Sequence, residues 1–118
     1  MSYMKRLIEG KVYVQVWLNE ADGGLNFLGY KPDHPLRLAT EYYIDAELLQ
    51  DGTPHAVLNA AFEQLNIDNP TEAWAKEYRI DRNRSLSVGD VVMVGETAYA
   101  CESIGWKAVS LTAEQCRR

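Results

Sequence analysis

The segment KVYVQVWLN, residues 11–19, alternates strictly between aliphatic side chains and aromatic or polar ones. One set of alternate positions holds Val12, Val14, Val16 and Leu18, and the other holds Tyr13, Gln15 and Trp17. A period of two is typical of a β-strand that packs one face against a core. The segment therefore predicts a half-buried strand with its aliphatic face turned inward.

The residues that follow predict two further strands. The sequence NEADGG, residues 19–24, is rich in turn formers, so residues 25–30 are expected to return as the second strand of an N-terminal hairpin over 10–30. Residues 31–35, KPDHP, predict a loop because proline cannot donate to a strand ladder. Residues 36–45, LRLATEYYID, alternate again and predict a third strand, one face of which would carry Leu36, Leu38, Thr40, Tyr42 and Ile44.

The middle of the chain predicts its main helix. Thr53 is a suitable N-cap and Pro54 suits the first helical position, where a missing N–H costs nothing. The helix should end near Asn66. Its apolar stripe at helical spacing consists of Val57, Leu58, Ala61, Phe62 and Leu65.

A second, shorter helix is expected over residues 70–78. Asn69 and Glu72 have the spacing of a capping box at its start. Trp74 and Tyr78, four residues apart, would share one face of this helix.

The last third of the chain predicts a second group of strands. Residues 79–84 show no apolar periodicity and indicate a loop, after which Gly89 is expected in a turn. The remaining elements are a hairpin of residues 91–94 and 97–104 around Gly95-Glu96, a last strand over 106–111, and a polar tail over 112–118 with at most one helical turn.

This order of elements predicts the fold class. Strands come first, then one main helix and one short helix, then strands again, without the regular strand–helix alternation of a parallel doubly wound sheet. We therefore predict an α+β domain over residues 1–118, with a mostly antiparallel curved sheet of five to six strands that forms a partial barrel.

Composition excludes several classes of protein. The 118 residues are 47% hydrophobic and 25% charged, with a formal net charge of −5, which is typical of one ordinary folded domain. Apolar runs are far shorter than the roughly 20 residues of a membrane-spanning helix. Glu9 and Lys11 interrupt the N-terminal segment before a signal-peptide core develops, so we expect a cytoplasmic protein without a membrane partner. Cys101 and Cys116 are then expected as thiols. Neither cysteine nor histidine spacing indicates a metal site or a cofactor.

Several segments in the second half carry a family resemblance. They are AFEQLN (61–66), Asn69-Pro70, RSLSVGDVV (84–92), Tyr99 and SIGW (103–106). In this combination they resemble the YodL-like domain family of bacterial proteins, over a core of residues 36–109. The resemblance implies a setting in plasmids, phages or other mobile elements, and it implies no assigned activity.

The residues themselves favour binding over catalysis. No serine or cysteine lies in a nucleophile motif, and Asp33-His34 in its proline-bounded loop has no such partner beside it in the sequence. We therefore expect a non-catalytic binding or regulatory module of the mobile-element type, not an enzyme, with a protein as its partner. The expected contact surface includes Trp17 or Trp106 and the arginine loop of residues 79–84.

Nucleic-acid binding is an alternative. Basic and aromatic residues interleave around the arginine loop, and Ser85 could add a donor to a phosphate. The basic residues of this hypothesis are Arg79, Arg82, Arg84 and Lys107. Lys76 and these three arginines are accompanied by Glu77 and Asp81, so the local excess of positive charge is small.

A second alternative is an acidic mimic of DNA that inhibits a DNA-processing enzyme. Residues 41–72 carry seven acidic side chains and no lysine or arginine. The acidic surface of this hypothesis consists of Glu41, Asp45, Glu47 and Asp51. It requires that these carboxylates share one face, because the field of so few charges is screened within roughly 8 Å.

Overall fold

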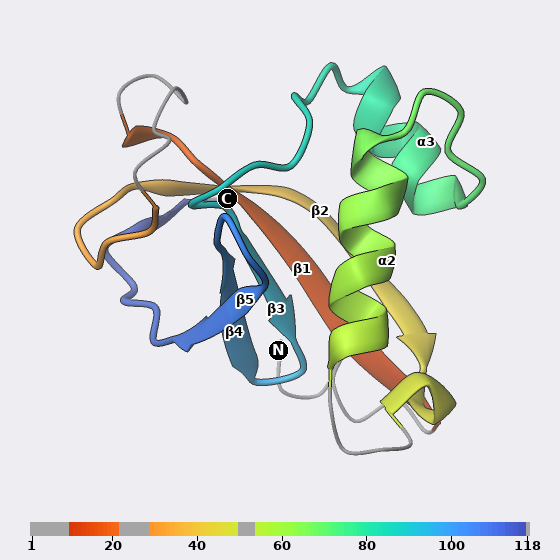
Figure 1. The fold of residues 1–118 in the computed structure, drawn as a ribbon, viewed down its shortest axis with the longest axis horizontal. Coiled ribbons are helices and arrows are strands. Elements are labelled where there is room, and N and C mark those ends of the chain that lie inside the picture. Colours follow the sequence, from red (N-terminus) through yellow and green to blue (C-terminus); the bar gives the residue numbers. More distant parts are fainter. Residues whose placement is uncertain (1–9, 22–28, 50–53, 118) are drawn as a thin grey trace.

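The structure is a computed structural model, and it describes residues 10–21, 29–49 and 54–117. Six strands form one sheet in the order β5-β4-β3-β1-β2-β6, which curls into a half-barrel with helices α2 and α3 against one face (Figure 1). The predicted α+β class with a curved sheet is confirmed. In chain order the elements are β1 (Lys11–Asn19), β2 (Leu36–Asp45), the 3₁₀-helix η2 (Ala46–Leu49), α2 (His55–Asn66), α3 (Ala73–Ile80), β3 (Val91–Val94), β4 (Thr97–Cys101), β5 (Trp106–Val109) and β6 (Cys116–Arg117).

The sheet is mixed rather than purely antiparallel, because β6 runs parallel to β2. All other neighbouring strands pair antiparallel. No helix within the described ranges is long and apolar enough to cross a membrane. The predicted returning strand at 25–30 falls largely outside the described residues, and the strand that pairs with β1 along its whole length is β2.

Strand β1 is buried on both faces, not on one as predicted. Val14, Val16 and Leu18 face α2 and α3, whereas Trp17 belongs to a second cluster on the opposite face. The curl of the sheet brings other parts of the chain over that second face. The partly buried residues that pack there are Tyr30, Leu38, Met93, Val109, Leu111 and Cys116.

A β-bulge divides strand β2 into two halves, and side chains at alternate positions of one half lie on the opposite face of the sheet from those of the other half. Val16 pairs with Thr40 but Trp17 pairs with Leu38, so Ala39 is an extra residue on the β2 side. Tyr42 consequently faces the helices, while Leu36 lies in the second cluster with Trp17. The prediction that the alternate residues from Leu36 to Ile44 share one face was therefore wrong, since an inserted residue reverses the alternation.

The starts of both helices differ from the predicted caps. Pro54 is the N-cap of α2 rather than its first helical residue, and Thr53 lies outside the described residues. The N-cap of α3 is Glu72, without a side-chain cap bond of its own, so the Asn69 capping box is wrong. Its place is taken by Gln64 of α2, whose Oε1 accepts hydrogen bonds from the backbone N–H groups of Thr71 and Glu72, at 2.9 and 3.0 Å.

The C-terminal residues form part of the sheet instead of the predicted polar tail. Gln115 is buried, and its Nε2 donates to the carbonyl oxygen of His34 at 2.9 Å. Its Oε1 accepts from the Tyr30 hydroxyl and the Thr112 N–H, both at 2.9 Å. The Gln115 carbonyl also accepts from the Leu36 N–H at 2.7 Å. One buried glutamine thus holds the tail against β2, and the two residues of β6 follow it.

Helix α3 ends in a Schellman-type cap with an arginine at the position that favours glycine. The N–H of Arg82 donates to the Arg79 carbonyl at 2.9 Å, and the N–H of Asn83 donates to the Tyr78 carbonyl at 3.3 Å. Arg82 has a φ of 63°. It is the one described non-glycine residue with a positive φ, a conformation in which the Cβ atom is crowded by the backbone.

Arg82→Gly is therefore expected to raise the free energy of unfolding by about 0.5–1 kcal/mol, the left-handed penalty less the added freedom of glycine in the unfolded chain. Urea denaturation followed by circular dichroism measures this change. Arg82→Ala is the matched control, because it removes the same side chain but keeps the strain. Equal stabilisation by both variants would contradict the backbone explanation.

Candidate functional site

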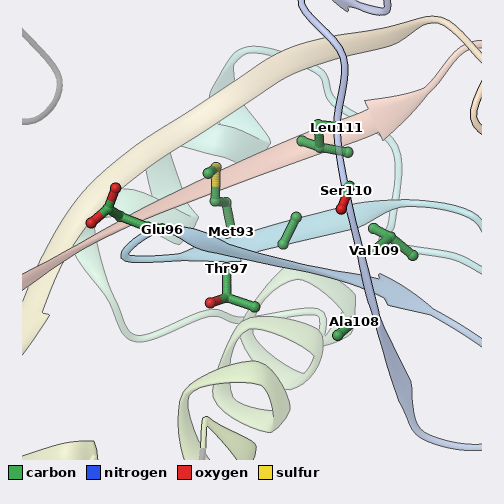
Figure 2. A pocket seen from close by; sticks show the side chains of 8 residues that line it. Met93, Glu96, Thr97, Ala108, Val109, Ser110 and Leu111 are labelled. Carbon is green, nitrogen blue, oxygen red and sulfur yellow. The ribbon is translucent and has the colours of Figure 1, made fainter.

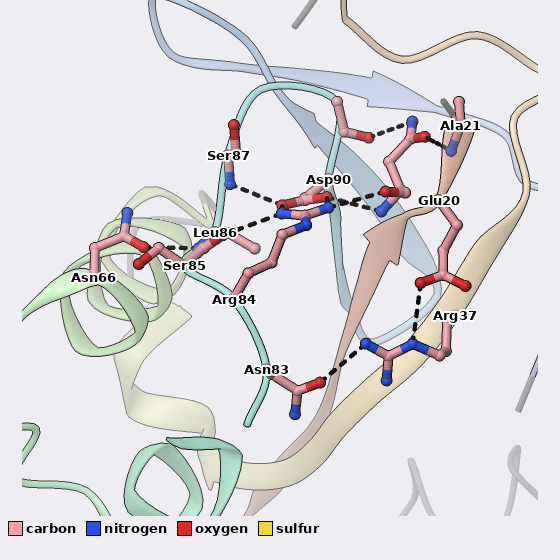
Figure 3. A network of polar contacts seen from close by, with 12 residues as sticks. Glu20, Ala21, Arg37, Asn66, Asn83, Arg84, Ser85, Leu86, Ser87 and Asp90 are labelled. Atoms are coloured by element: carbon pink, nitrogen blue, oxygen red, sulfur yellow. Dashed lines mark hydrogen bonds and ion pairs between the residues drawn. The ribbon is translucent and has the colours of Figure 1, made fainter. Parts of the chain in front are cut away.

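The arginine at position 84 is partly buried and belongs to an internal hydrogen-bond network around the fully buried Asp90 (Figure 3). Its guanidinium donates from Nη1 and Nη2 to the two carboxylate oxygens of Asp90, each at 2.7 Å. Asp90 is 0% exposed and also accepts from the backbone N–H groups of Asn19 (2.8 Å) and Ser87 (2.7 Å). A second bond from Arg84 Nη2 reaches the Asn19 carbonyl at 2.9 Å. This network joins the end of β1 to the segment before β3.

The chemistry of Arg84 follows from this pairing. The hydrogen bond to Asp90 raises the pKa of the Arg84 guanidinium, so the side chain is charged at every physiological pH. Two parallel N–H···O bonds to a fully buried carboxylate are the strong, geometrically specific form of ion pair. A phosphate could recruit Arg84 only by breaking this pair. The Ser85 carbonyl accepts another bond from Arg84, at 3.0 Å.

The other predicted basic residues are not gathered into one site. Arg79 donates to the backbone carbonyls of Ile67 and Asp68, and so ties the end of α3 to the loop after α2. Arg82 is exposed at the cap of α3. Lys107 is exposed on β5, where it pairs with Ala100 of β4.

The predicted acidic surface is also divided among elements. Glu41 and Asp45 lie on β2, and Glu47 lies on η2. Asp45 is paired with Lys11 across the β1–β2 ladder, at 2.5 Å. Asp51 lies outside the described residues.

The two tryptophans that were predicted to form a contact surface differ in burial. Trp17 is 3% exposed, because it packs in the second cluster with Val91 and Leu36. It is therefore not accessible to a partner, and its inclusion in a contact surface is corrected. Trp106 is half-buried on β5 and lines a surface hollow of about 230 Å³ beside α2.

One large exposed hydrophobic side chain lines this hollow, and another is the sequence neighbour of two lining residues. Phe62 of α2, predicted to face the core, lies in the hollow wall and is 42% exposed. Ile104 is 91% exposed in the β4–β5 turn, between the lining residues Ser103 and Gly105. We call Phe62, Ile104 and Trp106 the apolar corner. It lies next to β5, which is an edge strand of the sheet.

Cys101 also lines the hollow but is a poor nucleophile. Burial raises the pKa of its thiol to about 11, with the nearby Asp90 charge as a smaller cause. The thiolate is the reactive form of cysteine, so at neutral pH Cys101 is protonated and unreactive. Cys116 lies on a different strand, β6, and both cysteines are thiols. In the described part of the chain, no three side chains of metal-ligating type gather together.

A larger hollow of about 560 Å³ lies at the other side of β5 (Figure 2). Met93, Glu96 and Thr97 come from the β3–β4 hairpin, and the opposite wall is formed by residues 108–111. Glu96 is the one ionisable residue among those that line it. Its other polar side chains are Thr97 and Ser110, and the remaining lining residues are apolar.

Comparison of the chain with known protein families, with curated proteins and with solved structures found no significant match. The resemblance to the YodL-like domain family therefore stays a prediction, and the candidate site depends on the geometry alone. Sequence reasoning identified Trp106 but missed its neighbours. Phe62 matched the helical stripe of the core. Ile104 was placed in the predicted strand over 97–104, whereas β4 ends at Cys101 and Ile104 lies in the turn before β5.

Proposed function

We propose that the protein is a non-catalytic binding module that contacts a protein partner through the apolar corner. The observation that carries this proposal is the exposure of Phe62, which lines the same hollow as Trp106, and of Ile104, which lies between two lining residues of that hollow in the sequence. Burying one large aliphatic or aromatic side chain contributes about 1.5–3 kcal/mol. A partner that covers the apolar corner would therefore gain binding free energy from each of these side chains. Tryptophan is also among the residues that dominate measured interface energies.

The polar residues of the chain support binding rather than catalysis. Arg84, Asp90 and Asn19 satisfy one another inside the fold, and Cys101 is protonated. The same internal pairing weighs against the nucleic-acid alternative, because Arg79 and Arg84 are both engaged by groups of this chain. We do not propose DNA mimicry, because its carboxylates come from different elements and Asp45 has a lysine partner. The mobile-element setting rests on the family resemblance.

A photo-crosslinking residue at position 104, in the protein expressed in its native cells, is expected to form one discrete adduct. Trp106→Ala in the same chain should lower the adduct yield by about tenfold or more, because loss of a central aromatic contact typically costs at least about 2 kcal/mol. Gel mobility after protease or nuclease treatment identifies the adduct as protein or nucleic acid.

The matched control is the same crosslinker at Leu48, another exposed aliphatic residue, on η2. An identical adduct at both positions, or none at 104, would contradict docking at the apolar corner. A nuclease-sensitive adduct would favour the nucleic-acid alternative instead.

A further inference from the structure

A groove of about 300 Å³ separates strand β2 from helix α3. Its strand side is formed by four consecutive residues, 38–41, and its helix side by Trp74, Glu77 and Asp81. Successive side chains of a strand point to opposite faces of the sheet, so no single face carries four residues in a row. The groove therefore runs along the edge of β2. We call it the β2–α3 groove.

This edge of β2 already accepts a strand over its first two residues. β6 pairs parallel with β2 at Leu36 and Arg37, and beyond Arg37 no described strand pairs with this edge. In an antiparallel ladder such as β1–β2, alternate residues direct their N–H and C=O groups away from the partner. Ala39, the extra residue of the β-bulge in the β1–β2 ladder, also lines the groove, and bulges are over-represented next to functional sites.

The helix side of the groove presents one face of α3. Trp74, Glu77 and Asp81 follow one another at spacings of three and four, which brings them to the same side of a helix. The Trp74 ring is stacked on Tyr42 with ring centroids 3.8 Å apart and an angle of 5° between the ring planes. This stack holds the indole, which lines the groove, against Tyr42 of β2.

The groove walls are negatively charged. Glu41, Glu77 and Asp81 line them, and no lysine, arginine or histidine does. Glu77 and Asp81 are exposed, so a bound cationic side chain meets them without the cost of displacing an internal partner. Trp74 adds an aromatic surface, which attracts both apolar and cationic side chains.

We propose that the β2–α3 groove binds an extended, basic peptide segment of another protein, which adds a strand to the edge of β2 beyond Arg37, where no described strand pairs. Main-chain hydrogen bonds to residues 38–40 supply affinity, and Glu77 and Asp81 select lysine or arginine at alternate positions of the peptide. Four residues of strand span about 13 Å, so a short segment suffices. This surface is separate from the apolar corner, and the inference stands without the proposed function.

Fluorescence anisotropy with a labelled Lys-Val-Lys-Val-Lys-Val peptide at low salt tests the inference. The full-length protein should bind this peptide and not its Glu-Val counterpart. The double variant Glu77→Lys/Asp81→Lys should weaken binding by about tenfold, because two attractive pairs become repulsive. Hydrogen exchange of the backbone amides at residues 38–40 should slow when the peptide is bound.

Two matched controls make the test specific. Glu63→Lys/Glu114→Lys changes the net charge by the same amount at exposed sites away from the groove, and it should leave the affinity within about twofold. A peptide with N-methyl groups at alternate residues keeps its charge but loses strand hydrogen bonds, and it should not bind. Equal losses in both double variants, or binding of the N-methylated peptide, would overturn the proposal. Ile104→Asp should not change peptide affinity, so failure at the apolar corner and failure at the groove are distinguishable.

Discussion

Asp90→Ala is expected to lower the free energy of unfolding by about 3–5 kcal/mol. The substitution removes the fully buried carboxylate of the ion pair and leaves the guanidinium of Arg84, whose side chain is 34% exposed, without its partner. It also removes the carboxylate that accepts from the backbone N–H groups of Asn19 and Ser87, and a buried donor that loses its acceptor costs about 1–3 kcal/mol. Because a domain of this size typically has about 5–15 kcal/mol of stability, the loss is a large fraction of the total. Urea denaturation followed by tryptophan fluorescence measures it.

Asp90→Asn keeps the prediction testable where the alanine variant does not fold. The amide has the same shape but replaces one acceptor by a donor, so we expect a loss of about 1.5–3 kcal/mol. Arg84→Lys should also destabilise the fold, since an ammonium cannot reproduce two parallel bonds. Lys76→Ala, at an exposed position of α3, is the control and should stay within about 0.5 kcal/mol. Similar losses at Lys76 and Asp90 would contradict a central role for the network.

Leu58→Ala is expected to lower the free energy of unfolding by about 2–5 kcal/mol, whereas Phe62→Ala should cost much less, about 1 kcal/mol. Both residues belong to the same apolar stripe by sequence spacing, but Leu58 is 1% exposed and Phe62 is 42% exposed. Truncation of Leu58 creates a cavity beneath α2, and truncation of Phe62 enlarges a hollow that water already reaches. Thermal and urea denaturation of the two variants, side by side, measures the difference.

Crosslinking of the same two variants to the partner gives a second measurement. Phe62→Ala should reduce crosslinking from position 104 although it changes stability little, and Leu58→Ala should affect crosslinking only as far as it unfolds the chain. If Phe62→Ala destabilised the protein as much as Leu58→Ala, Phe62 would belong to the core and the apolar corner would lose one of its three members.

Local periodicity predicted most of the elements. The bounds of β1 and β2 and the end of α2 at Asn66 agree with the predictions, because each depends on spacing within a few residues. Positive φ angles at Gly89 and Gly95 confirm the predicted turns. The faces on which the β2 side chains lie were predicted wrongly. A one-residue bulge leaves the apolar alternation of the sequence intact, but it moves the side chains beyond it to the other face of the sheet.

The candidate site was predicted less well, and Arg84 and Trp17 show why. An arginine next to a serine is compatible with an exposed phosphate site and with an internal ion pair, and only the position of Asp90 decides between them. Tryptophan on the face opposite a valine stripe is compatible with exposure or with a second layer. In the structure that layer comes partly from residues near the C-terminus, far away in the sequence.

The sequence by itself determined the class of this protein: an α+β domain whose strands, main helix and turns follow from local apolar spacing and glycine placement. Only the tertiary structure decided which side chains meet across the chain. It paired Arg84 with Asp90, covered Trp17, exposed Phe62 and Ile104 beside Trp106, and left the edge of β2 facing α3. The physical reason is that backbone propensity acts over a few residues, whereas burial and charge pairing depend on contacts between segments whose separation in the chain carries no local signal.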